Sequence, residues 1–335
     1  FKEYIQLAKK YNYEIACLDF TDVPTEYSEW NNQGRAEYAI VPEHAIKRFE
    51  AQIEESAPLP EHIKIIKVKA NGDHLTELQN WLMPNILDLS SYKEVVHIGD
   101  IQGCLNPLLK ALPNGIEDDK FYIFIGDFCD RGEENGEVVR YLIDNVIGKP
   151  NVATLIGNHE YHLFREINGE EPVSEEFIQF TKKQFNLHGI GKTELKKLVS
   201  GIQDVIFYKH GDHKVMACHG GLPNVPKYPW MIPSYQYEKG VGYYEEDVDK
   251  TFNDMAPEGW YQVHGHRNIQ NHPIVLNRSI NLEGKVEFGG YLRMATLDKN
   301  GFTGHEYQND IVRPWRERLR RNGEIVPAWM AREEE

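Results

Sequence analysis

Short apolar runs that end in glycine or histidine recur along the chain between residues 95 and 264. They lie at 95–98, 123–125, 155–156, 217–218 and 263, and each is too short for a helix. Apolar runs of this length that are punctuated by glycine are typical of buried strands. Each run is followed, directly or after one glycine, by aspartate, asparagine or histidine. The pattern predicts a strand-rich domain with polar side chains at the ends of its strands.

A different alternation precedes residue 90. Apolar spacing predicts helices at 4–10, 42–54 and 75–82, with proline in the first turn of the second, and strands at 13–20 and 63–68. Helix, strand, helix and strand without a catalytic motif form half of an α/β domain.

Turn dipeptides organise the chain beyond residue 173. Gly211-Asp212 predicts a hairpin between 201–210 and 213–218, and a second hairpin is expected between 294–297 and 302–307. Helices are expected at 174–185 and from Thr193, as N-cap, to residue 199. The aromatic-rich segment 226–260 is expected to pack against the core or to stack on a base.

Composition indicates a cytoplasmic enzyme. The 335 residues carry a net charge of −15, which argues against a broad basic surface for nucleic acid, although a small RNA end remains an acceptable substrate. The four cysteines lack the spacing of a disulfide framework or a zinc ribbon. No apolar run approaches the ~18 residues of a membrane span.

The polar residues after the strands have the chemistry of a two-metal phosphoesterase. Carboxylate, amide and imidazole ligands suit two divalent ions about 3.5–4 Å apart that share one carboxylate and activate a water between them. The expected ligands are Asp100, Asp127 as the bridge, Asn158, His219 and His266. His264, two residues before His266 on the same strand face, is ambiguous: alignment on Gly-His favours His266 as the ligand, and His264 could support the ligands instead.

Three further residues suggest catalytic roles. His159 adjoins Asn158 and is expected to protonate the leaving oxygen. Arg131 offers a planar fork of donors for phosphate, and Asp130 could orient either His159 or Arg131.

These blocks resemble the calcineurin-like binuclear metallophosphoesterases over residues 94–298. Gly126-Asp127-Phe128-Cys129-Asp130-Arg131-Gly132 and Gly157-Asn158-His159-Glu160 are similar to the branch of protein Ser/Thr phosphatases, diadenosine tetraphosphatases and the phosphatase of polynucleotide kinase-phosphatases. The resemblance implies an α/β (α+β) fold, a metallophosphoesterase β-sandwich flanked by helices. It also implies the same metal, phosphate-binding and catalytic roles as the residues themselves suggest.

Two positions depart from the family pattern. Gln102 stands where the family usually has histidine and offers a weaker amide ligand, so the first metal site is expected to be looser. Glu283, within 277–292, stands where the similar stretch of kinase-phosphatases has aspartate, and it is expected to ligate or orient a metal ligand.

The first 90 residues resemble the C-terminal part of a P-loop polynucleotide kinase, because 35–48 is similar to its lid. No phosphate-binding loop accompanies them; 186–193 lacks the first glycine and follows a helix. The expected domains are thus 1–90, a partial N-terminal α/β kinase-like unit, 91–307, the metallophosphoesterase, and 308–335, a basic tail. The missing kinase half is expected upstream.

The expected function is metal-dependent hydrolysis of 3′-phosphate or 2′,3′-cyclic phosphate RNA ends. A diadenosine tetraphosphatase-like hydrolase and a protein Ser/Thr phosphatase are the alternatives, and a catalytically inactive scaffold is a further one that His159 and Arg131 oppose. The cofactor is two divalent metal ions, manganese first, with nickel, iron or zinc as alternatives. The expected partners are phosphorylated RNA or nucleotide ends and, in a homodimer, a second copy of the chain, but no membrane.

Overall fold

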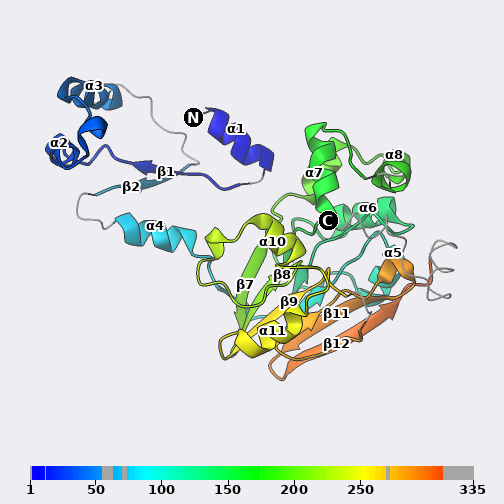
Figure 1. Cartoon of the computed structure of the whole chain (residues 1–335). Helices are drawn as coiled ribbons and strands as arrows, with labels where there is room; N and C mark the ends of the chain where they lie inside the picture. Colours follow the sequence, from blue (N-terminus) through cyan, green and yellow to red (C-terminus); the bar gives the residue numbers. More distant parts are fainter. Residues whose placement is uncertain are drawn as a thin grey trace. The chain divides into compact units, whose positions relative to one another are not determined.

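The chain folds into two compact units. The computed structural model describes residues 2–11, 13–54, 63–69, 74–174, 176–268 and 272–311. The units are Phe1–Met83 and Pro84–Glu335 (Figure 1). The division precedes the boundary expected at residue 90, because strand β3 (Leu87–Asp88) pairs in parallel with β7 (Val205–His210) of the second unit.

The first unit is small and helix-rich. Its elements are α1 (Lys2–Tyr11), β1 (Ala16–Asp19), α2 (Thr25–Gln33), η1 (Glu37–Ala39), α3 (Glu43–Glu54), β2 (Lys64–Lys67) and α4 (His74–Leu82). Strands β1 and β2 pair in parallel. The three predicted helices are present, whereas the strands are shorter than predicted. Helix α2 was not predicted, because it buries no residue and so lacks an apolar stripe.

Two five-stranded sheets form the frame of the second unit (Figure 1). The first has the order β10 (Ser279–Asn281), β9 (Trp260–His264), β8 (His213–Cys218), β7, β3. The second has the order β12 (Gly301–Gln308), β11 (Tyr291–Asp298), β4 (Glu94–Ile98), β5 (Lys120–Phe124), β6 (Val152–Thr154). Both predicted hairpins are present as the antiparallel pairs β7–β8 and β11–β12.

Both faces of the central strands are buried. On β4, Val95 contributes to a core that also contains Ile206, Val215 and Val263 of the other sheet. Val96, which points to the opposite face, belongs to a core shared with the helices that cover the second sheet. A third core lies between β7, β8 and helices α10 and α11. The expected sandwich flanked by helices is therefore confirmed.

Helices connect and cover the strands. Their bounds are α5 (Leu105–Ala111), α6 (Asn135–Asn145), α7 (Glu160–Asn168), a π-helix η2 (Phe177–Thr181), α8 (Lys182–Leu187), α9 (Lys192–Leu198), η3 (Pro229–Met231), α10 (Ser234–Lys239), α11 (Val248–Met255) and η4 (Val286–Phe288). None of the described helices is long and apolar enough to cross a membrane. Residues 312–335, most of the expected basic tail, lie outside the described residues.

The prediction that Thr193 caps helix α9 was wrong. The helix begins at Lys192, and Gly191 is its N-cap. The side chain of Glu194 accepts the Gly191 N–H at 3.1 Å, so a carboxylate inside the first turn satisfies the helix terminus. The helix expected at 174–185 is divided into η2 and α8.

Candidate metal centre and catalytic site

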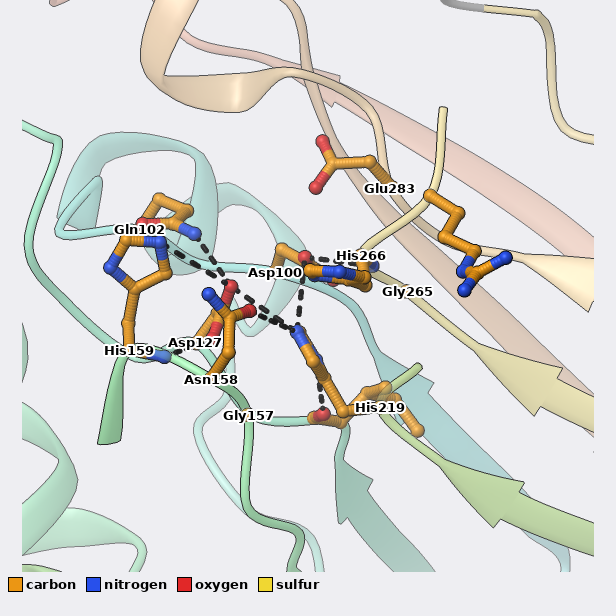
Figure 2. Close-up of polar contacts among 12 residues, drawn as sticks. Asp100, Gln102, Asp127, Gly157, Asn158, His159, His219, Gly265, His266 and Glu283 are labelled. Carbon is orange, nitrogen blue, oxygen red and sulfur yellow. Dashed lines mark hydrogen bonds and ion pairs between the residues drawn. The ribbon is translucent and has the colours of Figure 1, made fainter. Parts of the chain in front are cut away.

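The expected metal ligands lie beyond the carboxyl ends of strands from both sheets. Asp100 follows β4, Asp127 follows β5, Asn158 follows β6, His219 follows β8 and His266 follows β9. Because β4, β5 and β6 are parallel to one another, as are β8 and β9, their carboxyl ends meet. Figure 2 shows these five side chains converging.

The ligand atoms of three of these residues form one compact group. One atom each of Asp127, His219 and His266 lies within 4.8 Å of the others, and all three side chains are buried. The Nε2 atom of His219 lies 3.2 Å from Asp127 Oδ2 and 4.0 Å from Asp100 Oδ2. Asn158 Oδ1 lies 3.3 Å from the same nitrogen.

The orientation of His219 suits metal ligation. Its Nδ1 donates to the carbonyl oxygen of Ile125 at 2.9 Å, and a carbonyl can only accept, so the hydrogen of a neutral ring sits on Nδ1. The lone pair of Nε2 then faces Asp127 and Asn158. A carbonyl that holds the second ring nitrogen in this way is the usual support of a metal-binding histidine.

Unsatisfied acceptors also fit a cation. Gln102 donates its amide hydrogen to Asp127 Oδ2 at 2.7 Å, which leaves its buried Oε1 without a hydrogen-bond partner. Asp100 Oδ1 is likewise buried and without a partner, although Oδ2 accepts the His266 N–H at 3.0 Å. Burial raises the pKa of Asp100. A carboxylate oxygen and an amide oxygen with spare lone pairs, beside imidazole nitrogens, are the donor set of divalent metal ions.

The backbone around these residues is strained. Among the described residues, the non-glycine positions with positive φ are Gln102, Asp127, Asp130, His266 and Lys285. All five belong to the loops that carry the candidate site, where such conformations often store functional strain. Gly265 permits the close approach, because a Cβ atom there would overlap Asp100 Oδ1.

His159 is held by Asp130. Its Nδ1 lies 2.9 Å from Asp130 Oδ2, and Thr181 donates its hydroxyl to Asp130 Oδ1 at 2.9 Å. The Nε2 of His159 has no hydrogen-bond partner and lies 4.0 Å from Asp127 Oδ2. Burial lowers the pKa of His159, but the charges of Asp127 and Asp130 outweigh burial and raise it. The two carboxylates therefore favour the protonated form of the ring.

Arg131 and Glu283 are buried, and each lies beside an acidic side chain. The guanidinium of Arg131 is buried and contacts Glu287 Oε1 at 3.4 Å, a partner that the sequence did not suggest. Burial and the charge of the neighbouring Asp100 raise the pKa of Glu283 to about 8. The structure thus places Glu283 against an expected ligand, and its own ligation stays a prediction.

His264 points elsewhere. Its Nε2 lies 2.8 Å from Asp249 Oδ1 of α11, and its Nδ1 lies 2.9 Å from the Gly265 carbonyl. Both ring nitrogens are therefore occupied away from the candidate metal group.

Comparison with known proteins identifies the family. The family model described as calcineurin-like phosphoesterase matches residues 93–309. The chain belongs to this family. Its members are phosphoester hydrolases with a binuclear metal centre, and the donor set described above agrees with that centre.

The relatives carry several activities. The chain is 23% identical over 236 residues to the asymmetrical bis(5′-nucleosyl)-tetraphosphatase PrpE of Halalkalibacterium halodurans, covering 64% of this chain and 94% of the relative. It is 29% identical over 210 residues to the mouse (Mus musculus) serine/threonine-protein phosphatase with EF-hands 2. That alignment covers 60% of this chain and 25% of the relative. A solved structure, the cold-active protein-tyrosine phosphatase of a psychrophilic Shewanella species, is 17% identical with a TM-score of 0.43. The match covers 75% of this chain and 89% of the solved one.

One residue of this phosphoesterase site was missed. The buried carboxylate of Glu160 accepts the backbone N–H groups of Asp127 at 2.8 Å, Phe128 at 2.9 Å and Gly157 at 2.7 Å. It therefore joins the loop after β5 to the loop after β6, which carry Asp127 and Asn158. The run Gly157-Asn158-His159-Glu160 contained the signal, but the three donors come from segments that only the fold brings together.

The aromatic segment 226–260 contributes one side chain beside the site. Tyr244 donates its hydroxyl to the carbonyl of His266 at 2.6 Å, and the two rings meet edge to face with centroids 5.3 Å apart. Tyr237 is buried in the third core, whereas Tyr235 and Tyr243 are exposed. Packing thus accounts for Tyr237, and no contact of the described residues assigns base stacking to the exposed pair.

Proposed function

We propose that this metallophosphoesterase hydrolyses phosphate esters whose leaving group is a sugar hydroxyl, namely the 3′-phosphate or 2′,3′-cyclic phosphate of an RNA end. The observation that carries the proposal is the buried His159–Asp130 pair beside the candidate metal group. A proton donor helps most when the leaving oxygen is a strongly basic alkoxide. A phosphoanhydride releases a weakly basic phosphate and needs the donor much less.

Each side chain then has one task. Asp100, Asp127, Asn158, His219 and His266 would hold two divalent ions, with Gln102 and Glu283 as further candidate ligands, and manganese is the ion to test first. Such ions, when bound, neutralise the phosphate charge and supply an activated water. His159 gives its Nε2 proton to the leaving oxygen, while Asp130 keeps Nδ1 oriented. Arg131 would bind phosphate oxygens, exchanging its contact with Glu287.

Features of the first unit support the proposal that the substrate is an RNA end. Segment 35–48 resembles the lid of a polynucleotide kinase, and the α/β alternation with parallel β1 and β2 agrees with part of such a domain. We propose that Phe1–Met83 is kinase-derived. A phosphate-binding loop encoded directly upstream would support this assignment, and an upstream sequence without one would contradict it.

A substrate panel tests the proposed function. The full chain with manganese is given an RNA 3′-phosphate, a 2′,3′-cyclic phosphate, diadenosine tetraphosphate and a phosphoserine peptide, and kcat/KM is measured for each. We expect the highest kcat/KM for an RNA end. A higher value for the phosphopeptide would instead assign the chain to protein phosphatases, because serine is also an alkoxide leaving group.

Dinucleoside tetraphosphate hydrolysis is the second candidate. It is favoured by the match to PrpE, of which the aligned region covers 94%. His159→Ala separates the candidates: loss of RNA-end hydrolysis with retained tetraphosphate hydrolysis supports ester chemistry. A wild-type enzyme that cleaves the tetraphosphate at least about tenfold faster than any ester would overturn the first proposal.

A further inference from the structure

A second group of carboxylate and imidazole side chains lies next to the candidate metal centre. It consists of Asp130, His159 and His162, and one ligand atom of each lies within 4.8 Å of the other two. His159 is the N-cap of α7 and His162 stands three residues farther, a spacing that places both rings on one side of the helix. Their ring centroids are 6.1 Å apart.

His162 has an unused nitrogen. Its Nδ1 is buried and has no hydrogen-bond partner, which leaves a polar atom unsatisfied in the packed region beside Phe177. Burial lowers the pKa of His162 to about 4, so its ring is neutral at pH 7 and has a free lone pair. Metal ligation requires a neutral imidazole of this kind.

The geometry of the other two ligands needs little adjustment. Asp130 Oδ2 and His159 Nδ1 are 2.9 Å apart. Two ligand atoms that each bind zinc at about 2.0–2.1 Å in a tetrahedron lie about 3.3 Å apart, so the two atoms must separate by a few tenths of an ångström and the ring must turn until its Nδ1 lone pair faces the ion. Two imidazoles and one carboxylate, with water as the fourth ligand, are a common zinc set.

We propose that Asp130, His159 and His162 form a third metal site, which binds zinc and inhibits the enzyme. Zinc replaces the hydrogen shared between His159 Nδ1 and Asp130 Oδ2, and that proton leaves to solvent. The ring, bound to zinc through Nδ1, is then neutral, and its remaining Nε2 hydrogen is too weakly acidic to protonate the leaving oxygen. The inhibition rests on the proposed role of His159, whereas zinc binding at this site does not.

Zinc stoichiometry tests the site without any activity measurement. The full chain, freed of metal by a chelator, is dialysed to equilibrium against zinc, and bound zinc is counted. We expect His162→Gln and His162→Phe to bind one zinc fewer than the wild type, with the second variant preserving packing against Phe177. His305→Gln, in β12, is the matched control and should bind as many as the wild type. Equal counts for the wild type and both His162 variants would overturn the proposal, whatever the number of ions at the main centre.

Inhibition is measured separately. The manganese-loaded enzyme hydrolysing a phosphomonoester of an alcohol is titrated with zinc. We expect His162→Gln to raise the half-inhibitory zinc concentration at least about tenfold, with the zinc-free rate unchanged. Equal inhibition of both proteins would mean that zinc acts at the main centre, and the inhibitory role would be withdrawn.

Discussion

Two buried carboxylates of the site, Asp130 and Asp100, differ in whether both of their oxygen atoms have a hydrogen-bond partner. In the Asp130–His159 pair, each carboxylate oxygen has a protein partner, namely His159 and Thr181. In the metal group, Asp100 Oδ1 and Gln102 Oε1 have none. One buried carboxylate paired with one imidazole can hold a proton by itself, whereas two neighbouring carboxylates need cations. In the zinc-free enzyme, the same residue types would thus serve proton transfer in one place and metal binding in the other.

The largest loss of activity is expected when Asp127 is replaced. Replacement by alanine removes the carboxylate that faces His219, so the metal group loses its centre. We expect hydrolysis of p-nitrophenyl phosphate to fall by about 10³-fold or more, since metal ions supply several kcal/mol of transition-state stabilisation. Asp130→Asn is the control in the other cluster and should retain most activity on this substrate. Activity that survives both a chelator and Asp127→Ala would contradict a two-metal mechanism.

The second largest loss of activity is expected in the His159–Asp130 pair. His159→Ala should reduce hydrolysis of an RNA 3′-phosphate by about 10²–10⁴-fold. Hydrolysis of p-nitrophenyl phosphate should change little, because nitrophenolate leaves without a proton. Similar losses on both substrates would show that His159 serves binding or the metal group instead.

The pH dependence of kcat also tests whether His159 acts as the proton donor. The hydrogen bond to Asp130 favours the acid form of His159 and contributes to raising its pKa. With an alcohol ester, kcat should stay level up to this pKa and then fall about tenfold per pH unit as the ring loses its proton. Profiles of wild type and His159→Ala on both substrates measure this. An alkaline decline that persists in the variant would belong to another group.

Much of the site was visible in the sequence because its residues follow strands at short range. Glycine beside each block and the turn dipeptide Gly211-Asp212 leave local signals, so the sequence could predict that the expected ligands come together, and both predicted hairpins are present. Helix α2 was missed because it has no buried stripe, and Thr193 was misjudged because Glu194 satisfies the helix start.

Long-range partners left no such signal. The contact of Arg131 with Glu287 joins residues 156 positions apart, and the three donors to Glu160 become neighbours only in the fold. The partner of His264 is on α11, so only the structure places this histidine outside the metal group. A motif therefore indicates which residues act, while the fold decides what each one faces.

Replacing Glu160 is expected to weaken metal binding by an intermediate amount. Glu160→Gln puts an amide NH₂ against backbone donors, so one of three hydrogen bonds should be lost and the loops of Asp127 and Asn158 loosen. We expect metal affinity to weaken by about 10–100-fold, as for other residues that support ligands, and unfolding free energy to fall by about 1–3 kcal/mol. Titration calorimetry and thermal melts measure these. Glu166→Gln, whose partner Lys182 is near the surface, is the control on the same helix. Unchanged metal affinity in Glu160→Gln would show that the clamp does not support the ligands.

The smallest effect on metal affinity is expected at Gln102, whose side chain has one partnered and one unpartnered polar atom. Its amide donates to Asp127 while its Oε1 remains without a partner. Histidine is a better ligand than an amide for transition metals, so Gln102→His should lower the half-maximal metal concentration a few-fold, less than the roughly 10–100-fold effect at Glu160. Gln102→Met, which keeps the length but removes both polar atoms, should raise it. If neither variant moves the metal titration, Gln102 only orients Asp127, and the unpaired Oε1 does not contact the ion.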